Sequence, residues 1–552
     1  MDTRAPGTSP TVNTPPQEGY GSIPALITQA AARYAEQDAL VDGEVRWTFA
    51  RLDREIARAA RAAIAAGLAP GDRVAVWAPN CREWITAALG AVSVGAILVP
   101  LNTRYKGAEA ADILRRSGAR LLFTVRGFLG TDYPALLAGE ELPLLERTVL
   151  LRGAADDAAD PGPARADSYR PDSYRAYLAA GDAVPDARRR ERAAAVRPDD
   201  LSDILYTSGT TGRPKGVMCS HGQTLAVFQG WADAVGIREG DRYLLVNPFF
   251  HTFGYKAGVL ACLLRGVTMV PEPVFDAGQA LRRIAEERIS VLMGPPTVFH
   301  SLLRHPDRAA HDLTSLRLAG TGAATIPTEL VEQIRGELRI PRVFTAYGLS
   351  ECVGVATICP PDADAATVAG TVGLPLRGTE LRIVDAAGEP QPAGTAGEIV
   401  VRGYHVMRGY LDDPGASARA VDPAGWLHTG DVGLLDPRGH LVVTDRLKDM
   451  YIVGGFNVYP AEVERVLLGH PAIADTAVIG VPDERLGEVG AAYLVAAGAA
   501  VPEEAEVIAW ARERLANFKV PRRVRVVAEL PRNAGGKVLK ARLRELEEQR
   551  EE

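Results

Sequence analysis

The sequence predicts an α/β protein with a large N-terminal domain of parallel-type sheets, a β-rich subdomain and a small α+β C-terminal domain. Residues 20–150 alternate helical and strand patterns, which is typical of βαβ units. Residues 366–445 carry short strand patterns separated by Gly, Pro and Asp turns, and βαβ-like material begins again after residue 448. The length of 552 residues also predicts more than one domain.

The first elements follow in order. Residues 1–20 hold Pro, Thr and Gly without a signal-peptide pattern, so a disordered tail is expected, and a helix over 23–35 and a strand over 74–77 come next. The stretch from Trp84 to Leu101 has no charge, but alanine dominates it and glycines and a proline interrupt it. We expect a buried helix from about Arg82, a turn at Gly95 and a core strand, and no stable membrane span.

The later elements complete the domain assignment. Residues 153–197 are rich in Ala, Asp and Arg and are predicted to be a solvated surface insertion within an N-terminal core of residues 21–447. Strands are expected over 380–384 and 397–401. A C-terminal domain of residues 448–552 should contain a helix near 461–468, an apolar segment at 474–481 and a charged final helix.

Composition limits the function classes. The net charge of −7 and the isoelectric point of about 5.9 do not indicate nucleic-acid binding. The five cysteines form no CxxC pair, which argues against a zinc or disulfide framework and favours a reducing cytoplasm. A homodimer is compatible with the sequence, which does not determine the oligomeric state.

The richest motif is the loop at residues 207–216, TSGTTGRPKG. Its glycines let backbone N–H groups approach a ligand, its hydroxyls are rotatable donors, and Lys215 supplies a point charge that suits phosphate. The apolar residues before it predict a strand, and α/β folds bind ligands where strands end. The spacing is not that of the Walker A motif, because Pro214 stands where a glycine is required. The loop is therefore predicted to cradle a polyphosphate.

Lysine usage points to the same loop. Only seven of the 62 basic residues are lysines, so a lysine that remains is a candidate for chemistry that arginine cannot provide. Lys215, Lys448 and Lys537 all lie within glycine-bearing motifs. Four further motifs follow the loop, namely YGLSE at 347–351, WLHTGD at 426–431, DRLKDMYIVGGFNVYP at 445–460 and NAGGK at 533–537.

These five motifs, in this order, resemble those of the adenylate-forming enzymes: acyl- and aryl-CoA ligases, luciferases and the adenylation domains of peptide synthetases. The resemblance covers nearly all of residues 20–545. It departs mildly at Ser350, where threonine is usual, and at Asp445, where glycine is common. It implies an N-terminal adenylation core, the substrates ATP and CoA, and Mg²⁺.

The resemblance also implies roles for individual residues. Lys537, Glu351 and His251 correspond to catalytic positions, and Glu351 and Thr207 to positions at the metal. Lys448 corresponds to a hinge about which a mobile C-terminal domain turns, and Gly454, Gly455 and Phe456 to the CoA path. The ATP-binding positions are Thr207, Ser208, Gly209, Thr210, Thr211, Gly212, Lys215, Ala323, Tyr347, Gly348, Ser350, Asp431 and Arg446.

The acyl pocket is expected between residues 248–256 and residues 320–324. His251, Phe253, Tyr255, Lys256 and Gly322 are its candidate lining, with the two aromatic rings narrowing the pocket. Lys256 has two readings: it binds a distal keto or carboxylate group of the acid, or it faces solvent. The segments HTFGYKAG, TGAAT and DRLKDMYIVGGFNVYPAEVE resemble those of a bacterial steroid-degradation CoA ligase, and aryl acids remain open.

The predicted function is ATP-dependent ligation of a cyclic, bicyclic or aryl carboxylic acid to CoA. An acyl-adenylate and pyrophosphate form first, and AMP is released on transfer to CoA. No carrier-protein domain is recognisable after Lys540, which favours free CoA. The alternatives are an adenylating enzyme with a carrier-protein or amine acceptor, a diazotase that activates nitrite, and a non-catalytic nucleotide-binding protein.

Overall fold

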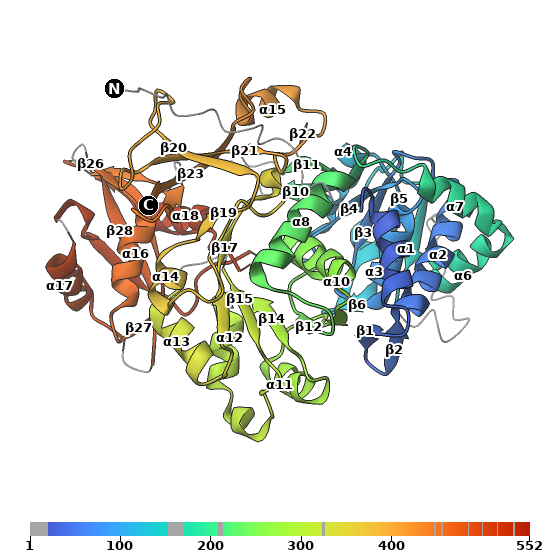
Figure 1. Ribbon diagram of the computed structural model, residues 1–552. Coiled ribbons are helices and arrows are strands. Elements are labelled where there is room, and N and C mark those ends of the chain that lie inside the picture. The colour runs from blue at the N-terminus through green and yellow to red at the C-terminus, as the bar shows by residue number, and fades with distance from the viewer. Residues whose placement is uncertain are drawn as a thin grey trace, which may run out of the picture.

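Three groups of sheets make up the chain in a computed structural model (Figure 1). The structure describes residues 20–152, 171–207, 214–322, 326–446, 449–453, 456–483, 485–498, 501–515, 517–533 and 536–551. Two large, mostly parallel sheets form the N-terminal part, antiparallel strands follow them, and a smaller sheet with its own helices ends the chain. The predicted fold class is confirmed.

The first large sheet has eight strands in the order β22-β11-β10-β4-β3-β5-β8-β9. Pairing is parallel from β10 to β9, whereas β10, β11 and β22 pair antiparallel. In chain order the strands are β3 (Arg73–Trp77), β4 (Ile97–Pro100), β5 (Ala119–Thr124), β8 (Arg147–Leu150), β9 (Asp172–Ser173), β10 (Leu201–Thr207), β11 (Lys215–Ser220) and β22 (Gly409–Tyr410). The helices are α1 (Ile23–Arg33), α2 (Phe49–Ala65), α3 (Arg82–Val92), α4 (Gly107–Ser117), α5 (Tyr133–Leu136) and α8 (His221–Val235), and a small hairpin is formed by β6 (Arg126–Phe128) and β7 (Thr131–Asp132).

The second large sheet has seven strands in the order β16-β15-β14-β12-β13-β1-β2 and is parallel except between β1 and β2. Its strands are β1 (Asp38–Asp42), β2 (Val45–Thr48), β12 (Arg242–Leu245), β13 (Thr268–Pro271), β14 (Val291–Gly294), β15 (Leu318–Thr321) and β16 (Arg342–Phe344). Its helices are α9 (Thr252–Gly254), a π-helix (Tyr255–Leu260), α10 (Ala261–Arg265), α11 (Ala277–Glu286), α12 (Pro296–Arg304), the 3₁₀ helix η3 (Pro306–Ala310) and α13 (Thr328–Gly336). A continuous apolar core joins the two sheets through the helices between them.

The β-rich part matches the expectation for residues 366–445. One small sheet contains β17 (Ala346–Tyr347), β18 (Thr357–Ile358) and β19 (Leu374–Pro375). A four-stranded antiparallel sheet contains β20 (Thr379–Val384), β21 (Gly397–Gly403), β23 (Leu427–Leu435) and β24 (Leu441–Arg446). Short helices η4 (Ser350–Cys352), α14 (Ala365–Gly370) and α15 (Pro414–Ala420) lie in the connections.

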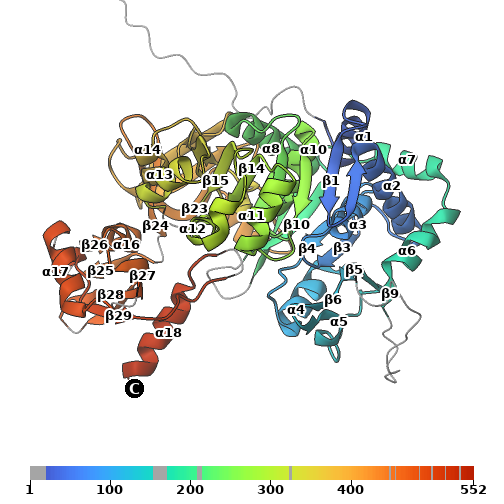
Figure 2. The same cartoon turned by 90° about the horizontal axis from the view of Figure 1, so that it is seen from below.

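The C-terminal part has separate apolar cores of its own. Its strands are β25 (Tyr451–Val453), β26 (Phe456–Val458), β27 (Ile473–Asp483), β28 (Gly487–Ala496) and β29 (Arg523–Val526). Its helices are α16 (Pro460–Leu468), α17 (Glu504–Arg514), the short η5 (Asn517–Lys519) and α18 (Lys540–Glu551). Figure 2 shows this part set to one side of the two large sheets. The boundary predicted at Lys448 falls between β24 and β25, on residues outside the described ones.

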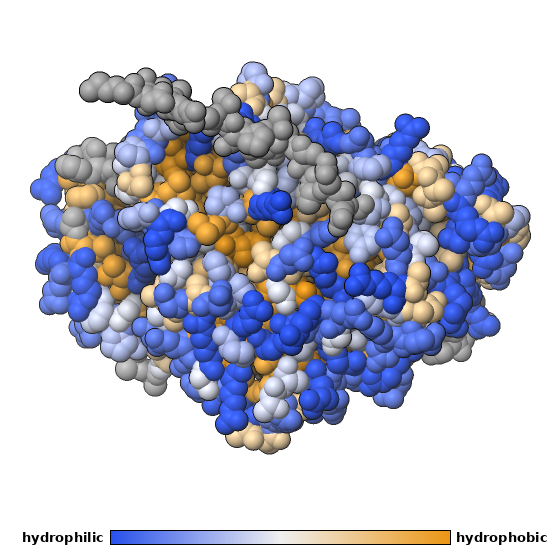
Figure 3. Space-filling model, in the orientation of Figure 1, coloured by the Kyte–Doolittle hydropathy of each residue, from blue (hydrophilic) through white to orange (hydrophobic). Residues whose placement is uncertain are grey.

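The uncharged stretch from Trp84 to Leu101 is a buried helix, a turn and a core strand, as predicted. α3 ends at Val92, Gly95 adopts a left-handed φ of 86°, and β4 is fully buried. Among the described helices, none combines the length and apolar character needed to cross a bilayer. Hydrophilic residues dominate the face shown in Figure 3.

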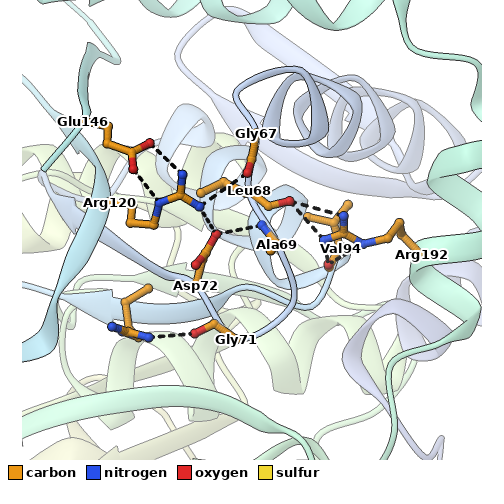
Figure 4. Close-up of polar contacts among 10 residues, drawn as sticks. Gly67, Leu68, Ala69, Gly71, Asp72, Val94, Arg120, Glu146 and Arg192 are labelled. Carbon is orange, nitrogen blue, oxygen red and sulfur yellow. Dashed lines mark hydrogen bonds and ion pairs between the residues drawn. The ribbon is translucent and has the colours of Figure 1, made fainter. Parts of the chain in front are cut away.

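Residues 172–184 of the expected surface insertion pack on the core instead, which corrects the prediction there, whereas residues 186–194 include no buried residue and lie at the surface as predicted. Here β9 extends the first sheet and α6 (Tyr174–Ala180), the short 3₁₀ helix η1 (Gly181–Ala183) and α7 (Asp186–Ala194) follow. Tyr177 is 1% exposed and its ring meets Phe123 edge-on at 5.1 Å. The guanidinium of Arg192 donates to the carbonyls of Leu68 and Val94, at the ends of α2 and α3 (Figure 4). The buried rings of Tyr174 and Tyr177 and the hydrogen bonds of Arg192 therefore hold this segment on the core, although its overall composition is polar. Residues 153–170 lie outside the described residues.

All five cysteines are free and buried in the structure: Cys81, Cys219, Cys262, Cys352 and Cys359. Burial raises the pKa of every one of these thiols above its ordinary value.

Candidate active site

The strands that flank the predicted phosphate loop are in place. β10 ends at Thr207, β11 begins at Lys215, and these two residues face each other in the antiparallel pair. The loop therefore leaves the end of a strand, as predicted. Ser208, Gly209, Thr210, Thr211 and Gly212 lie outside the described residues, and so does Ala323.

A tyrosine joins the phosphate-loop lysine to the candidate metal ligand. β22 pairs with β11 so that Tyr410 lies opposite Val217. The ammonium of Lys215 lies 4.9 Å from the centre of the Tyr410 ring, and the Tyr410 hydroxyl donates to Glu351 Oε1 at 2.9 Å. Burial, together with the carboxylate of Glu351, raises the pKa of Tyr410. A cation and an anion from distant motifs are thus held against one aromatic ring.

The nucleotide side of the site combines two other predicted motifs. The hydroxyl of Tyr347 donates to Asp431 Oδ2 at 2.6 Å, and burial followed by this carboxylate raises the pKa of Tyr347 well above 10.0. Asp431 lies opposite Arg446 in the register of β23 and β24. Gly348 is required where it stands, because a Cβ there would lie 2.3 Å from the Gly354 carbonyl oxygen. Three of the predicted ATP positions therefore come together, with Ser350 close by at the start of η4.

The acyl side is built around His251, which caps α9. Its Nδ1 accepts a hydrogen bond from the Phe253 backbone N–H at 3.2 Å. The residue is exposed, yet desolvation by the surrounding protein lowers the pKa of its imidazole. Phe253 is half-buried beside it, and Gly322 follows the end of β15 near Thr345.

Two of the predicted lining residues are buried in the interior, unlike His251 and Phe253. Tyr255 is 0% exposed and packs against Trp84 with 5.6 Å between ring centres. Lys256 is also 0% exposed, and its Nζ lies 2.8 Å from Asp203 Oδ2. The reading in which Lys256 faces solvent is wrong, because an acidic partner on β10 holds it in the interior. Nothing in the local pattern around Lys256 indicates this partner.

The candidate catalytic lysine of the C-terminal part lies on a turn. Asn533 and Lys537 exchange two hydrogen bonds: Asn533 N–H donates to the Lys537 carbonyl at 2.8 Å, and Lys537 N–H donates to Asn533 Oδ1 at 2.9 Å. Gly536 has a φ of 82°, and a Cβ there would lie 3.6 Å from Pro295 Cβ. The turn that carries Lys537 therefore lies beside Pro295, which connects β14 of the second large sheet to α12.

Other predicted positions of the C-terminal part stay untested. Lys448, Gly454 and Gly455 lie outside the described residues. The backbone of Phe456 forms the start of β26, and β26 pairs with β25.

Oxygen donors characterise the candidate metal position. Glu351 offers a carboxylate and Thr207 a hydroxyl, and both are hard ligands of the kind that Mg²⁺ accepts. Among the described residues, no group of three or more His, Cys, Asp and Glu side chains gathers where it could hold a metal ion. Mg²⁺ is usually held by one or two carboxylates together with substrate phosphates and water.

Comparison with known proteins shows the family of the chain. The family described as AMP-binding enzyme matches residues 27–411, and the AMP-binding enzyme C-terminal domain matches residues 462–537. The chain belongs to the AMP-binding enzyme family. The matched ranges lie on either side of the predicted hinge.

Relatives and a solved structure narrow the class. A protein of Mycobacterium tuberculosis named 3-[(3aS,4S,7aS)-7a-methyl-1,5-dioxo-octahydro-1H-inden-4-yl]propanoyl:CoA ligase is 51% identical over 525 residues, 95% of this chain and 99% of the relative. A Rhodococcus jostii protein of the same name is 50% identical over 528 residues, 95% and 98% of the two chains. The crystal structure of the anthranilate CoA ligase AuaEII in complex with anthranoyl-AMP superposes with a TM-score of 0.82 at 27% identity, covering 96% of this chain and 98% of that chain.

The chain is an ATP-dependent acid–CoA ligase that works through an acyl-adenylate. ATP and CoA are its substrates. The predicted enzyme class is confirmed, and the diazotase alternative finds no support among these relatives.

Proposed function

We propose that the acid is a bicyclic ketone bearing a propionate side chain, of the kind named for the two bacterial relatives. The observation that carries this proposal is 51% and 50% identity over nearly the whole chain to two CoA ligases with the same named acyl group. The half-buried Phe253 ring, two residues after His251, favours a cyclic acid over one that carries a second charge.

In the first half reaction the carboxylate of the acid attacks the α-phosphate of ATP and pyrophosphate leaves. Negative charge accumulates in the transition state, so positioned cations and donors provide most of the catalysis. Lys537 supplies a positive charge at the reacting oxygens, and the loop at residues 207–216 with Lys215 holds the phosphates. Tyr347 and Asp431 hold the nucleoside. Glu351 and Thr207 would hold Mg²⁺, which would neutralise charge on the phosphates.

In the second half reaction the CoA thiol attacks the carbonyl of the adenylate and AMP leaves. Lys537 and the incoming thiol must reach the same carbonyl from the C-terminal side. We infer a rotation of the C-terminal domain about Lys448, which brings Gly454, Gly455 and Phe456 to the site. The separate apolar cores of that domain support rotation as a unit.

The test is release of pyrophosphate and AMP from MgATP over a panel of acids, with and without CoA. The panel contains the bicyclic diketo-propionate, anthranilate, ferulate and a fatty acid. We expect turnover with the bicyclic acid and a CoA thioester of matching mass. Preference for an aryl acid would overturn the proposed acid substrate. Turnover that does not depend on CoA but depends on an added amine would overturn the assignment of CoA as acceptor.

A further inference from the structure

The ion pair between Asp203 and Lys256 is fully enclosed. Both side chains are 0% exposed and Nζ lies 2.8 Å from Oδ2. Burying two opposite charges carries a desolvation penalty that their attraction does not always repay, and apolar residues of similar volume are often as stable. A contribution to stability is therefore a weak explanation for the presence of this ion pair. Its location in the fold gives a better indication of its role.

The pair connects the two halves of the active site. Asp203 belongs to β10, which ends at Thr207 where the phosphate loop begins. Lys256 belongs to the π-helix that continues directly from α9, and the Tyr255 N–H at its start donates to the His251 carbonyl at 2.9 Å. The strand that presents the phosphate loop is thus tied to the helix that presents His251.

The start of that helix has little freedom of its own. A Cβ at Gly254 would lie 2.1 Å from the Pro248 carbonyl oxygen, and one at Gly258 would lie 2.9 Å from Leu245 Cδ2. A π-helix is a rare, wider turn that occurs often at functional sites. A shift of Lys256 would therefore move the segment that ends at His251.

Among the groups that surround the pair, the attraction between Asp203 and Lys256 is the strongest electrostatic interaction. Ser202 donates to Asp203 Oδ1 at 2.7 Å, and Cys219, His221 and Tyr255 also interact electrostatically with this carboxylate. Burial lowers the pKa of His221 to about 4, so this ring is neutral near pH 7. Asp203 and the neighbouring Cys219 raise the pKa of Lys256 despite its burial, so the ammonium stays charged.

We propose that Asp203 and Lys256 are positioning residues that fix the acyl site relative to the phosphate loop. In this role they align the acid carboxylate with the α-phosphate and do not contact either substrate. The proposal deepens the ligase function proposed above and rests on it. A misplacement of about 1 Å at a reacting centre lowers a rate by about 10²-fold, which makes such a pair worth its burial.

The test compares Lys256→Met, Asp203→Leu and the double variant. Each single substitution strands a buried charge, so we expect a lower Tm. In the double variant the charges are gone and Tm should return close to that of the wild type. Its kcat for acid-dependent ATP–pyrophosphate exchange should stay about 10- to 100-fold below wild type, while the KM for ATP changes less than about twofold. The probe acid is the bicyclic diketo-propionate.

A double variant with both Tm and kcat of the wild type would show a purely structural pair and overturn the proposal. Should the double variant not fold, Asp203→Asn keeps the shape of the side chain, and wild-type kcat and acid KM in that variant would overturn the proposal equally. Arg317→Met is the matched control, because Arg317 pairs with the 3%-exposed Asp241 in the other large sheet. It should lower Tm and leave kcat unchanged.

The two proposals fail separately. If wild-type enzyme ignores the bicyclic acid, the substrate assignment fails, and the same variants are compared on whichever panel acid gives turnover. If wild-type enzyme accepts the bicyclic acid and the double variant matches it, only the positioning role fails.

Discussion

The hydroxyl of Tyr410 donates to Glu351 at 2.9 Å, while the same ring carries the ammonium of Lys215 on its face at 4.9 Å from its centre. One side chain from β22 thus sets the distance between the phosphate-loop cation and the carboxylate proposed to bind Mg²⁺. The backbone reinforces this arrangement, because Met407 N–H donates to the Glu351 carbonyl and Leu411 N–H to the Gly216 carbonyl, each at 2.8 Å.

Tyr410→Phe keeps the ring and removes the hydrogen bond to Glu351. A hydrogen bond to a charged group contributes about 1.5–3 kcal/mol. We therefore expect the affinity for Mg²⁺ to fall roughly 10-fold, so that a higher Mg²⁺ concentration is needed for half-maximal activity. The measurement is a Mg²⁺ titration of pyrophosphate exchange, together with Mn²⁺ binding followed by electron paramagnetic resonance. Tyr133→Phe is the control, since its hydroxyl donates to the Thr103 carbonyl at 2.8 Å far from the site. An unchanged Mn²⁺ affinity in Tyr410→Phe would remove Tyr410 from the metal site.

Lys537→Ala should abolish adenylation while nucleotide binding persists. Loss of one preorganised charge at the transition state lowers the rate by about 10²–10³-fold. Rates of pyrophosphate exchange and the affinity for a fluorescent ATP analogue measure the two effects. Lys519→Ala serves as the comparison, because Lys519 pairs with Glu462 within the C-terminal part at 2.6 Å. If nucleotide affinity fell in parallel with the rate, Lys537 would be a binding residue rather than a catalytic one.

Asp431→Asn should weaken ATP binding more than it slows the bound enzyme. The substitution removes the charge that accepts the Tyr347 hydroxyl at 2.6 Å. We expect the KM for ATP to rise about 10-fold, in line with one charged hydrogen bond. Steady-state kinetics at saturating acid and CoA separate KM from kcat. Asp385→Asn, in a turn between β20 and β21, is the control, and a fall in kcat at unchanged KM would contradict the nucleoside-binding role.

Stability should fall as the pH decreases from about 6.5 to about 4. Burial lowers the pKa of His221 and of His405 to about 4, whereas an unfolded histidine titrates near 6.5. Over this range the unfolded chain takes up protons that the native protein does not, so acid favours unfolding. Urea unfolding at a series of pH values measures the slope. His405→Asn should flatten it, and an identical slope would exclude His405 as a source.

Local patterns predicted the elements whose neighbours lie close in the sequence. The buried helix and strand around Gly95 follow from an uncharged alanine-rich run with one turn residue, and the phosphate loop follows from a strand and its glycines. Tyr174 and Tyr177 were missed because the surrounding Asp and Arg outweighed them in composition. Their spacing of one helical turn was the available signal.

The contacts that organise the site join segments far apart in the sequence. Nothing near Tyr410 indicates Glu351 or Lys215, and nothing near Lys256 indicates Asp203. These contacts depend on the order of strands in the first sheet, where β22, β11 and β10, which carry Tyr410, Lys215 and Asp203, are neighbours. A single sequence does not determine strand order, so the residue types were predictable and the pairs were not.

The buried cysteines have a practical consequence for following the C-terminal part in solution. Thiol reagents attack the thiolate, and burial disfavours the thiolate in all five native side chains. The unaltered protein therefore already provides a silent background for site-specific labelling. Probes at engineered cysteines near Gly536 and Pro295 would report on that contact during turnover, with every native residue of the core retained.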